Sequence, residues 1–234
     1  MANSKKEQDE KRVEKEWEAV DHAVFTSGNF IEKNQKPILI GVGAIVVVVC
    51  LFLAVKQFYL NPRNEKAQAE LFRGEEYFRA EQDSLTLFGD GKGFSGMVAF
   101  VNEYGSTKAG NVAKAYAGIS YARLGKYDQA LKYLKDFSGK DELISYAVDG
   151  AIGDCYANQN KPEDAASQFM KAANGADDAL LSPIYLKKAG IVYRQLKQYD
   201  KVIEVFTKLK NNYMNTPEAA EADKYIGEAE LLKK

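Results

Sequence analysis

The sequence contains little of the material from which catalytic and metal-binding sites are usually built. Among its 234 residues are one histidine, two cysteines and one tryptophan. A Cys/His nucleophile pair or a multi-histidine metal site therefore has too few residues to draw on. Cys50 lies inside an apolar run far from Cys155, so we expect no internal disulfide. We predict that the chain is not an enzyme and has no cofactor and no metal site.

A strong net charge is also missing. The 32 basic residues are balanced by 33 acidic ones, which argues against a nucleic-acid partner. The glycine-rich stretch at residues 89–93 is not a phosphate loop, because it does not match GxxxxGK[ST] and follows no strand. Asp90 stands there without the spacing of an EF-hand calcium loop. We interpret the stretch as a flexible turn.

One long run without charge stands out against this background. Residues 38–55 are 18 consecutive uncharged residues, and as a helix they would measure about 27 Å, close to the hydrocarbon thickness of a bilayer. We predict a transmembrane anchor over residues 37–60. A buried core helix is the alternative, but β-branched apolar runs of this length are rare in soluble domains. A cleaved signal peptide is disfavoured, since the tail of 36 residues is too long and no small-x-small site follows the run.

Residues 1–36 form the expected cytoplasmic tail. It carries seven Lys and Arg residues, which favours an N-terminus in the cytoplasm and the remainder of the chain on the other side of the membrane. Three interpretations stay open for a short amphipathic helix in residues 5–31: it lies on the inner membrane surface, it docks a partner, or it is solvated and frays. Its apolar residues recur at spacings of four, three and four: Val13, Trp17, Val20 and Val24.

A glycine followed three residues later by a tyrosine occurs four times on a helical pattern. The glycines are separated by 44, 35 and 37 residues. Recurrence at such a period indicates a stacked helical repeat, and a stacked repeat usually forms a binding surface. The pairs are Gly74/Tyr77, Gly118/Tyr121, Gly153/Tyr156 and Gly190/Tyr193.

The spacing also fixes a register. With each glycine at position 8 of a 34-residue unit, the tetratricopeptide pattern asks for Tyr at position 11, a small residue at 20 and an aromatic residue at 24. The third unit fits best, with Tyr156, Ala165 and Phe169, and the fourth supplies Phe206. We expect the small residues at positions 8 and 20 to let the two helices of a unit, helix A and helix B, approach closely. The aromatic residue at position 24 then fills the gap beside them, and the tyrosine at position 11 packs over the next turn.

The two ends of the repeat region depart from the pattern. In the first unit, we expect the glycine-rich stretch to lengthen the turn, with Gly96 and Phe100 then supplying the small and aromatic positions of helix B. At the other end, Gly227 follows Gly190 by 37 residues in a charged segment. We expect this segment to be a solvating cap helix, as terminal repeats require.

Residues 64–234 thus resemble a tetratricopeptide-repeat protein. The family's Trp at position 4 is missing, and Lys114, Asp149 and Leu186 stand there instead. We predict an all-α fold with a single N-terminal transmembrane helix, followed over residues 61–234 by a tetratricopeptide-repeat superhelix of about four repeats plus a cap helix.

The whole layout is similar to the membrane-anchored YfgM-like proteins of Gram-negative bacteria, and residues 30–36 resemble the pre-anchor segment of the Bacteroidetes versions. That family is associated with the Sec translocon and with periplasmic chaperones. The resemblance therefore implies a single-pass protein of the inner membrane, with the repeats in the periplasm and with a protein partner of that kind.

In such a superhelix, the concave face is built from helix A positions 2, 5, 9, 12 and 13. Polar residues recur at position 13, and such a row could hold the backbone or the carboxylate terminus of an extended peptide. An ordinary solvated face is the alternative interpretation. The predicted protein-binding residues are Phe78, Arg79, Ile119, Arg123, Asp154, Asn158, Lys187, Ile191 and Arg194.

Two functions fit this interpretation. The first is a membrane-anchored protein-interaction module, an ancillary subunit or chaperone-like adaptor at the Sec translocon or at another envelope complex. The second is a structural scaffold of an envelope machine that makes no contact with nascent chains. The sequence determines neither the identity of the partner nor the oligomeric state.

Overall fold

The computed structural model describes residues 34–139 and 142–233, and every regular element in these two ranges is a helix. The predicted all-α fold is therefore confirmed. The chain divides into two compact units, residues 1–61 and residues 62–234. The predicted amphipathic helix of the tail lies outside the described residues.

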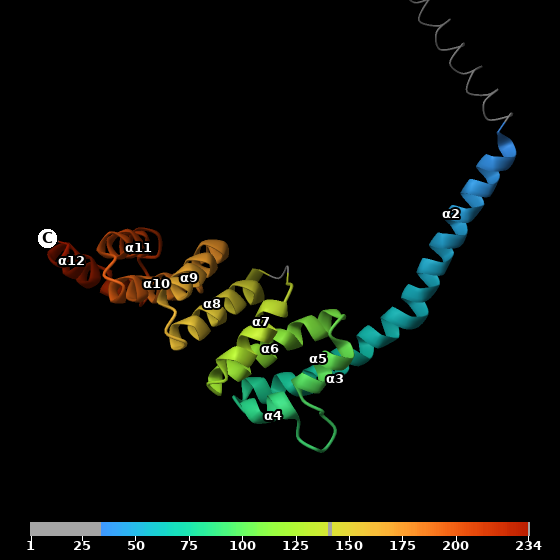
Figure 1. Ribbon diagram of the computed structural model, residues 1–234, viewed down its shortest axis with the longest axis horizontal. Helices are drawn as coiled ribbons and strands as arrows, with labels where there is room; N and C mark the ends of the chain where they lie inside the picture. The colour runs from blue at the N-terminus through green and yellow to red at the C-terminus, as the bar shows by residue number, and fades with distance from the viewer. Residues whose placement is uncertain (1–33, 140–141, 234) are drawn as a thin grey trace, which may run out of the picture. The chain divides into compact units, whose positions relative to one another are not determined.

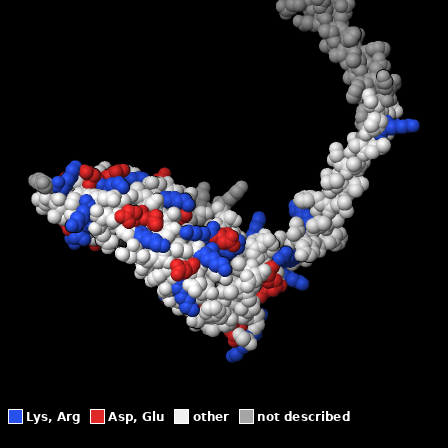
Figure 2. Space-filling view, in the orientation of Figure 1, with Lys and Arg blue, Asp and Glu red and all other residues white. Residues whose placement is uncertain are grey.

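In the first unit, the described residues form an apolar helix whose side chains are exposed. Helix α2 spans Gln35–Val55, and a π-helical turn, η1, follows over Lys56–Leu60. The stretch Gln35–Arg79 is the one described helical stretch that is long and apolar enough to cross a membrane, with a mean hydropathy of 3.2 over 18 residues, none of them buried. On the face shown in Figure 2, the middle of α2 carries no charged side chain. A helix also satisfies its own backbone hydrogen bonds, as lipid requires.

The second unit consists of successive antiparallel helix pairs, which Figure 1 shows from green to red. In the first pair, helix A is α3 (Asn61–Arg79), and helix B is broken into α4 (Asp83–Phe88) and α5 (Met97–Tyr104). After the fourth helix pair come a 3-10 turn, η2, and one more helix, α12, which lies in the place of a helix A. The remaining elements are α6 (Lys108–Arg123), α7 (Tyr127–Asp136), α8 (Glu142–Asn158), α9 (Pro162–Ala176), α10 (Ser182–Gln195), α11 (Tyr199–Asn212), η2 (Ala219–Glu221) and α12 (Ala222–Leu232).

The position-8 glycines lie where helix A touches helix B of the same unit. A Cβ atom added to Gly118 would lie 2.5 Å from Cγ of Leu134, and one added to Gly153 would lie 2.6 Å from Cε1 of Phe169. Gly190 faces the ring of Phe206 in the same way, at 2.5 Å. These partners occupy position 24, so the structure shows the predicted glycine-to-position-24 packing in three units.

The position-11 tyrosines differ in their surroundings. Tyr121 is buried, and its ring stacks on Tyr133 of its own helix B with 5.5 Å between ring centres. Tyr156 is only half-buried, and it packs against two separate apolar clusters. Nζ of Lys135, from helix B of the preceding repeat, lies 5.3 Å from its ring centre. The Tyr156 ring therefore also contacts the repeat before it.

In the first repeat, other residues cover the position-8 glycine, and the expectation for this repeat was wrong. The glycine-rich insertion does not lengthen the turn between helix A and helix B, since it lies inside helix B, between α4 and α5. Phe94 and Met97, not Phe100, cover Gly74. Gly96 is the N-cap of α5 and has a φ of 88°. Glycine adopts this backbone conformation readily because it has no Cβ atom.

Asp90 makes several hydrogen bonds inside this insertion, and the flexibility expected for the stretch stays a prediction. Its Oδ1 accepts hydrogen bonds from the backbone N–H groups of Lys92 at 2.8 Å and Phe94 at 3.1 Å. The Tyr77 hydroxyl donates to Oδ2 at 2.8 Å. These donors, the Lys92 N–H first, lower the pKa of Asp90 to about 2. The loop in turn places Phe94 over Gly74.

The four turns between helix A and helix B share one backbone closure. Each has a residue with positive φ at position 15: 54° at Glu81, 71° at Gly125, 59° at Asn160 and 58° at Lys197. In each turn, the next N–H donates at 2.9 Å to the carbonyl of the position-11 tyrosine. This six-to-one bond closes helix A with a left-handed residue. Three of the four turns achieve it without glycine, at a cost of about 1 kcal/mol each.

Candidate protein-binding face

The nine residues predicted to form the binding face are all accessible. Arg79, Arg123, Asn158 and Arg194 are exposed, and the other five are half-buried. Accessibility alone does not make these side chains available to a partner, because several of them also contact neighbouring helices.

Arg123 joins the second repeat to the first. Its guanidinium lies 4.7 Å from the centre of the Phe78 ring, and Nη1 lies 3.5 Å from Oδ1 of Asp83. That oxygen is buried and has no hydrogen bond among the described residues, so the nearby positive charge compensates its burial. The Phe78 ring also packs on Tyr116, with ring centres 4.6 Å apart. Arg123 therefore contributes to the stacking of the two repeats.

Arg194 and Lys187 make similar contacts toward the C-terminal helix. Nε of Arg194 donates to Oε1 of Glu228 on α12 at 3.0 Å. Nζ of Lys187 lies 3.1 Å from a carboxylate oxygen of Glu221 in η2. Two of the three basic residues of α10 are therefore paired with acids of η2 and α12, which follow the last complete repeat.

Asp154 and Glu75 extend this pattern to the other helices. Nζ of Lys188 lies 2.7 Å from Oδ1 of Asp154, one 34-residue repeat earlier. The Tyr116 hydroxyl donates to Glu75 at 2.9 Å. Burial, and then this carboxylate, raises the pKa of Tyr116 to about 12. The structure thus shows polar contacts between α3 and α6, between α8 and α10, and between α10 and α12. Sequence reasoning did not predict that Glu75, Lys188, Glu221 and Glu228 would be the partners in these contacts.

Two of the remaining predicted residues make polar contacts within their own helix. Arg79 pairs with Glu75 at 3.6 Å. The Asn158 amide donates to the backbone carbonyl of Asp154 at 2.8 Å. Half-buried Ile119 and Ile191 lie at the matching position of α6 and α10. Between the polar contacts, the accessible face thus presents the side chains of Ile119 and Ile191 and the amide of Asn158. Its use as a binding site stays a prediction.

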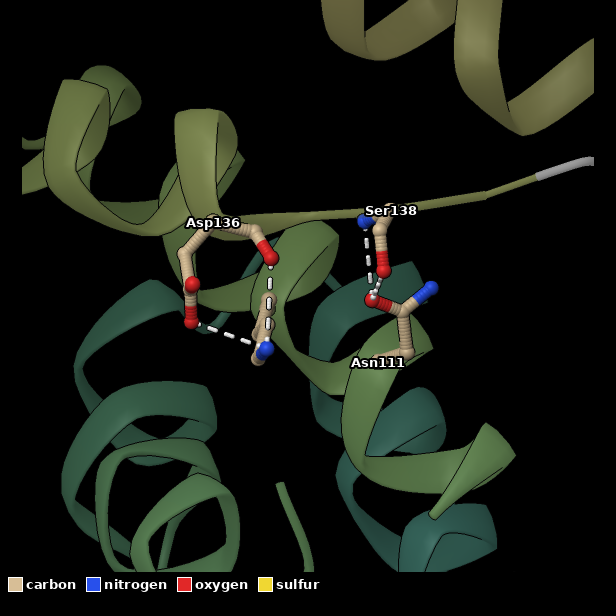
Figure 3. Close-up of polar contacts among 4 residues, drawn as sticks. Asn111, Asp136 and Ser138 are labelled. Carbon is tan, nitrogen blue, oxygen red and sulfur yellow. Dashed lines mark hydrogen bonds and ion pairs between the residues drawn. The ribbon is translucent and has the colours of Figure 1, made fainter. Parts of the chain in front are cut away.

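Charged residues at position 4 explain the missing tryptophans. Lys114 reaches across to helix B of its unit, where Nζ lies 2.8 Å from Oδ2 of Asp136 and donates to its backbone carbonyl at 3.2 Å (Figure 3). Beside this contact, Asn111 accepts from the backbone N–H of Ser138 at 2.9 Å.

The next unit repeats the contact with the charges exchanged. Oδ1 of Asp149 lies 2.8 Å from Nζ of Lys171, again 22 residues along the chain. Both position-4 side chains are only 13% exposed. An ion pair therefore fills the place where the family has an indole ring, and in the fourth unit the fully buried Leu186 does so.

Among the described residues, no group of three or more His, Cys, Asp or Glu side chains could hold a metal ion. Cys155 is fully buried, and burial raises the pKa of its thiol to about 11, which keeps it protonated at neutral pH. The expectation that the chain is not an enzyme stays a prediction.

These helix pairs, with glycine opposite position 24 and a shared turn, define an all-α helical-repeat protein. The family model of the tetratricopeptide repeat matches residues 116–140, which cover the end of α6, the turn and α7. The chain therefore contains a segment that matches the tetratricopeptide repeat. No curated protein matches it.

Proposed function

We propose that this chain is a membrane-anchored protein-interaction module that serves as an ancillary subunit or chaperone-like adaptor at the Sec translocon or another envelope complex. The carrying observation is the combination, in one chain, of an exposed apolar helix long enough for a bilayer with a tetratricopeptide-repeat unit. Tetratricopeptide repeats bind proteins, and an anchor confines that binding to a membrane surface.

The proposal places the anchor in the inner membrane, with the N-terminus in the cytoplasm and the repeats in the periplasm. The seven basic residues of the tail support this orientation. In spheroplasts, external protease should degrade residues 61–234 and leave the tail intact. A repeat region that resists external protease before lysis would contradict the orientation.

The accessible part of the helix-A face is the proposed contact surface. Ile119 and Ile191 offer apolar contact, and Asn158 lies at position 13 of the helix between them, where its amide could bond an extended backbone. Charge reversal at Arg123 or Arg194 would be a poor test, because each would place a glutamate against an acid of the protein's own fold. Substitutions at the two isoleucines avoid that ambiguity.

Photocrosslinking in living cells tests the proposal. A photoreactive residue is placed at Ile119 or Ile191, with Lys132, which is exposed on helix B, as the matched control position. Adducts with secreted polypeptides from the two isoleucines support the adaptor. Adducts with one fixed membrane complex support the scaffold instead. The same adducts from Lys132 would contradict binding at the helix-A face.

A further inference from the structure

The outer face of α12 differs from that of every earlier helix A. Gly74, Gly118, Gly153 and Gly190 each lie under a side chain of helix B, closer than 3 Å to an added Cβ. Gly227 occupies the same position 8 in α12 and has nothing within 4 Å. Among the described residues, no helix covers it.

The residues around Gly227 are accessible as well. Asp223 lies four residues before it and Leu231 four after, so helical spacing puts all three on one face. The Asp223 side chain is 75% exposed and Leu231 is 71% exposed. The other side of the helix is packed, since Ala222 is fully buried and Ala229 is 2% exposed. The exposed face is therefore a continuous part of a well-anchored helix.

The third repeat shows what such a face accepts. There, Asp149 and Gly153 stand at positions 4 and 8 of α8, with the same spacing as Asp223 and Gly227. Helix α9 covers that face, with the Phe169 ring over the glycine and Nζ of Lys171 at 2.8 Å from the aspartate. An apolar ring and a lysine two residues later thus match the combination of acid and glycine.

We propose that the outer face of α12 binds a helix of a partner protein, one that carries a large apolar residue two positions before a lysine. The apolar side chain covers Gly227 and the lysine pairs with Asp223. This interaction surface is separate from the helix-A face of the proposed function, and neither depends on the other.

Charge selects this occupant over a second copy of the chain. Two α12 helices packed antiparallel about Gly227 would bring Asp223 of one copy beside Glu230 of the other, and like charges oppose that pairing. Asp223 already has a partner, Lys210, at 2.6 Å, but both side chains are more than half exposed. An exposed pair of this kind is worth roughly 0–1 kcal/mol, so an incoming lysine can replace it at small cost.

The probe is a fluorescent peptide with the sequence of residues 162–176. It is crosslinked between positions 163 and 167, because a free helix of this length is marginal in water. Fluorescence anisotropy measures its binding to the purified full chain in detergent micelles. Gly227→Phe and Asp223→Lys should each weaken binding by about tenfold or more, while Glu76→Lys, a charge reversal at an exposed site on α3, should leave it unchanged.

A charge exchange completes the test. A peptide with Lys171→Glu should fail on the natural chain and bind the Asp223→Lys variant. Unaltered far-UV circular dichroism of the Gly227→Phe variant shows that folding is intact, as the open space at that site predicts. Absence of saturable binding, or equal binding by Gly227→Phe, would overturn the proposal. So would a dimer in sedimentation that Gly227→Phe abolishes, since the occupant would then be a second copy.

Discussion

The guanidinium of Arg123 stacks over the ring of Phe78, 45 residues earlier in the chain, with 4.7 Å between its central carbon and the ring centre. The same guanidinium lies 3.5 Å from the carboxylate of Asp83. A residue that sequence position assigns to a binding surface thus also stabilises the contact between two repeats, and its substitution affects both.

Arg123→Ala should lower the free energy of unfolding by about 1 kcal/mol, since it removes a cation–π contact and leaves a buried carboxylate oxygen without a counter-charge. Urea unfolding of the full chain in detergent micelles measures the change. The matched control is Arg79→Ala, which removes a 73% exposed arginine with only a pair inside its own helix and should cost about 0–0.5 kcal/mol. Equal losses would contradict a role in repeat stacking.

Two glycines at the same repeat position should respond to alanine in opposite directions. Gly153→Ala places a methyl group 2.6 Å from the Phe169 ring, so we expect a loss of about 1–3 kcal/mol. Gly227→Ala meets nothing within 4 Å and removes the helix penalty of glycine, so we expect a gain of about 0.5–1 kcal/mol. Thermal unfolding followed by circular dichroism compares them, and a destabilised Gly227→Ala variant would refute the open face.

Lys197→Gly should stabilise the protein by about 0.5–1 kcal/mol, because the residue holds a φ of 58° that costs glycine nothing. Gly125→Ala, at the equivalent turn with a φ of 71°, should destabilise it by about 1 kcal/mol. Urea midpoints at constant slope report both changes. If Lys197→Gly instead lowers the midpoint, the side chain stabilises the fold more than the left-handed backbone strains it.

The Asp90 carboxylate should make stability depend on pH in the acid range. Its folded pKa of about 2 lies below the ordinary value of 3.8, so its contribution is complete above about pH 3.8 and disappears as the pH falls through 2. Asp90→Ala should therefore unfold at lower urea than the natural protein at neutral pH, and the difference should shrink between pH 4 and pH 2. A difference independent of pH would show that the charge of Asp90 does not hold the insertion.

Local spacing predicts the fold well because the packing rule is itself local. Gly153 and Phe169 are 16 residues apart in one helix pair, so their contact follows from the register. The first unit escapes this rule because a broken helix B lets Phe94 take the place of a position-24 residue. Tyr156 escapes it because Lys135, which lies over its ring, belongs to the preceding repeat. No spacing rule within one unit supplies the geometry of a loop or of a contact between repeats.

The candidate face was predicted less completely. Register assigns Arg123 and Arg194 to accessible positions of helix A, and both are exposed. It does not reveal that Asp83 and Glu228 lie within reach, because those contacts depend on how successive repeats are stacked. Opposite charges 34 residues apart are a signal in the sequence that could have indicated such contacts, since Asp154 and Lys188 share this spacing with Arg194 and Glu228.

The two ion pairs at position 4, which have opposite polarity, favour the correct pairing of helix A with helix B. Correct pairing puts Lys114 beside Asp136 and Asp149 beside Lys171. If α6 paired with α9, two lysines would face each other, and if α8 paired with α7, two aspartates would. Repeats of similar shape could exchange partners during assembly, and the alternating polarity of the two ion pairs penalises that mistake.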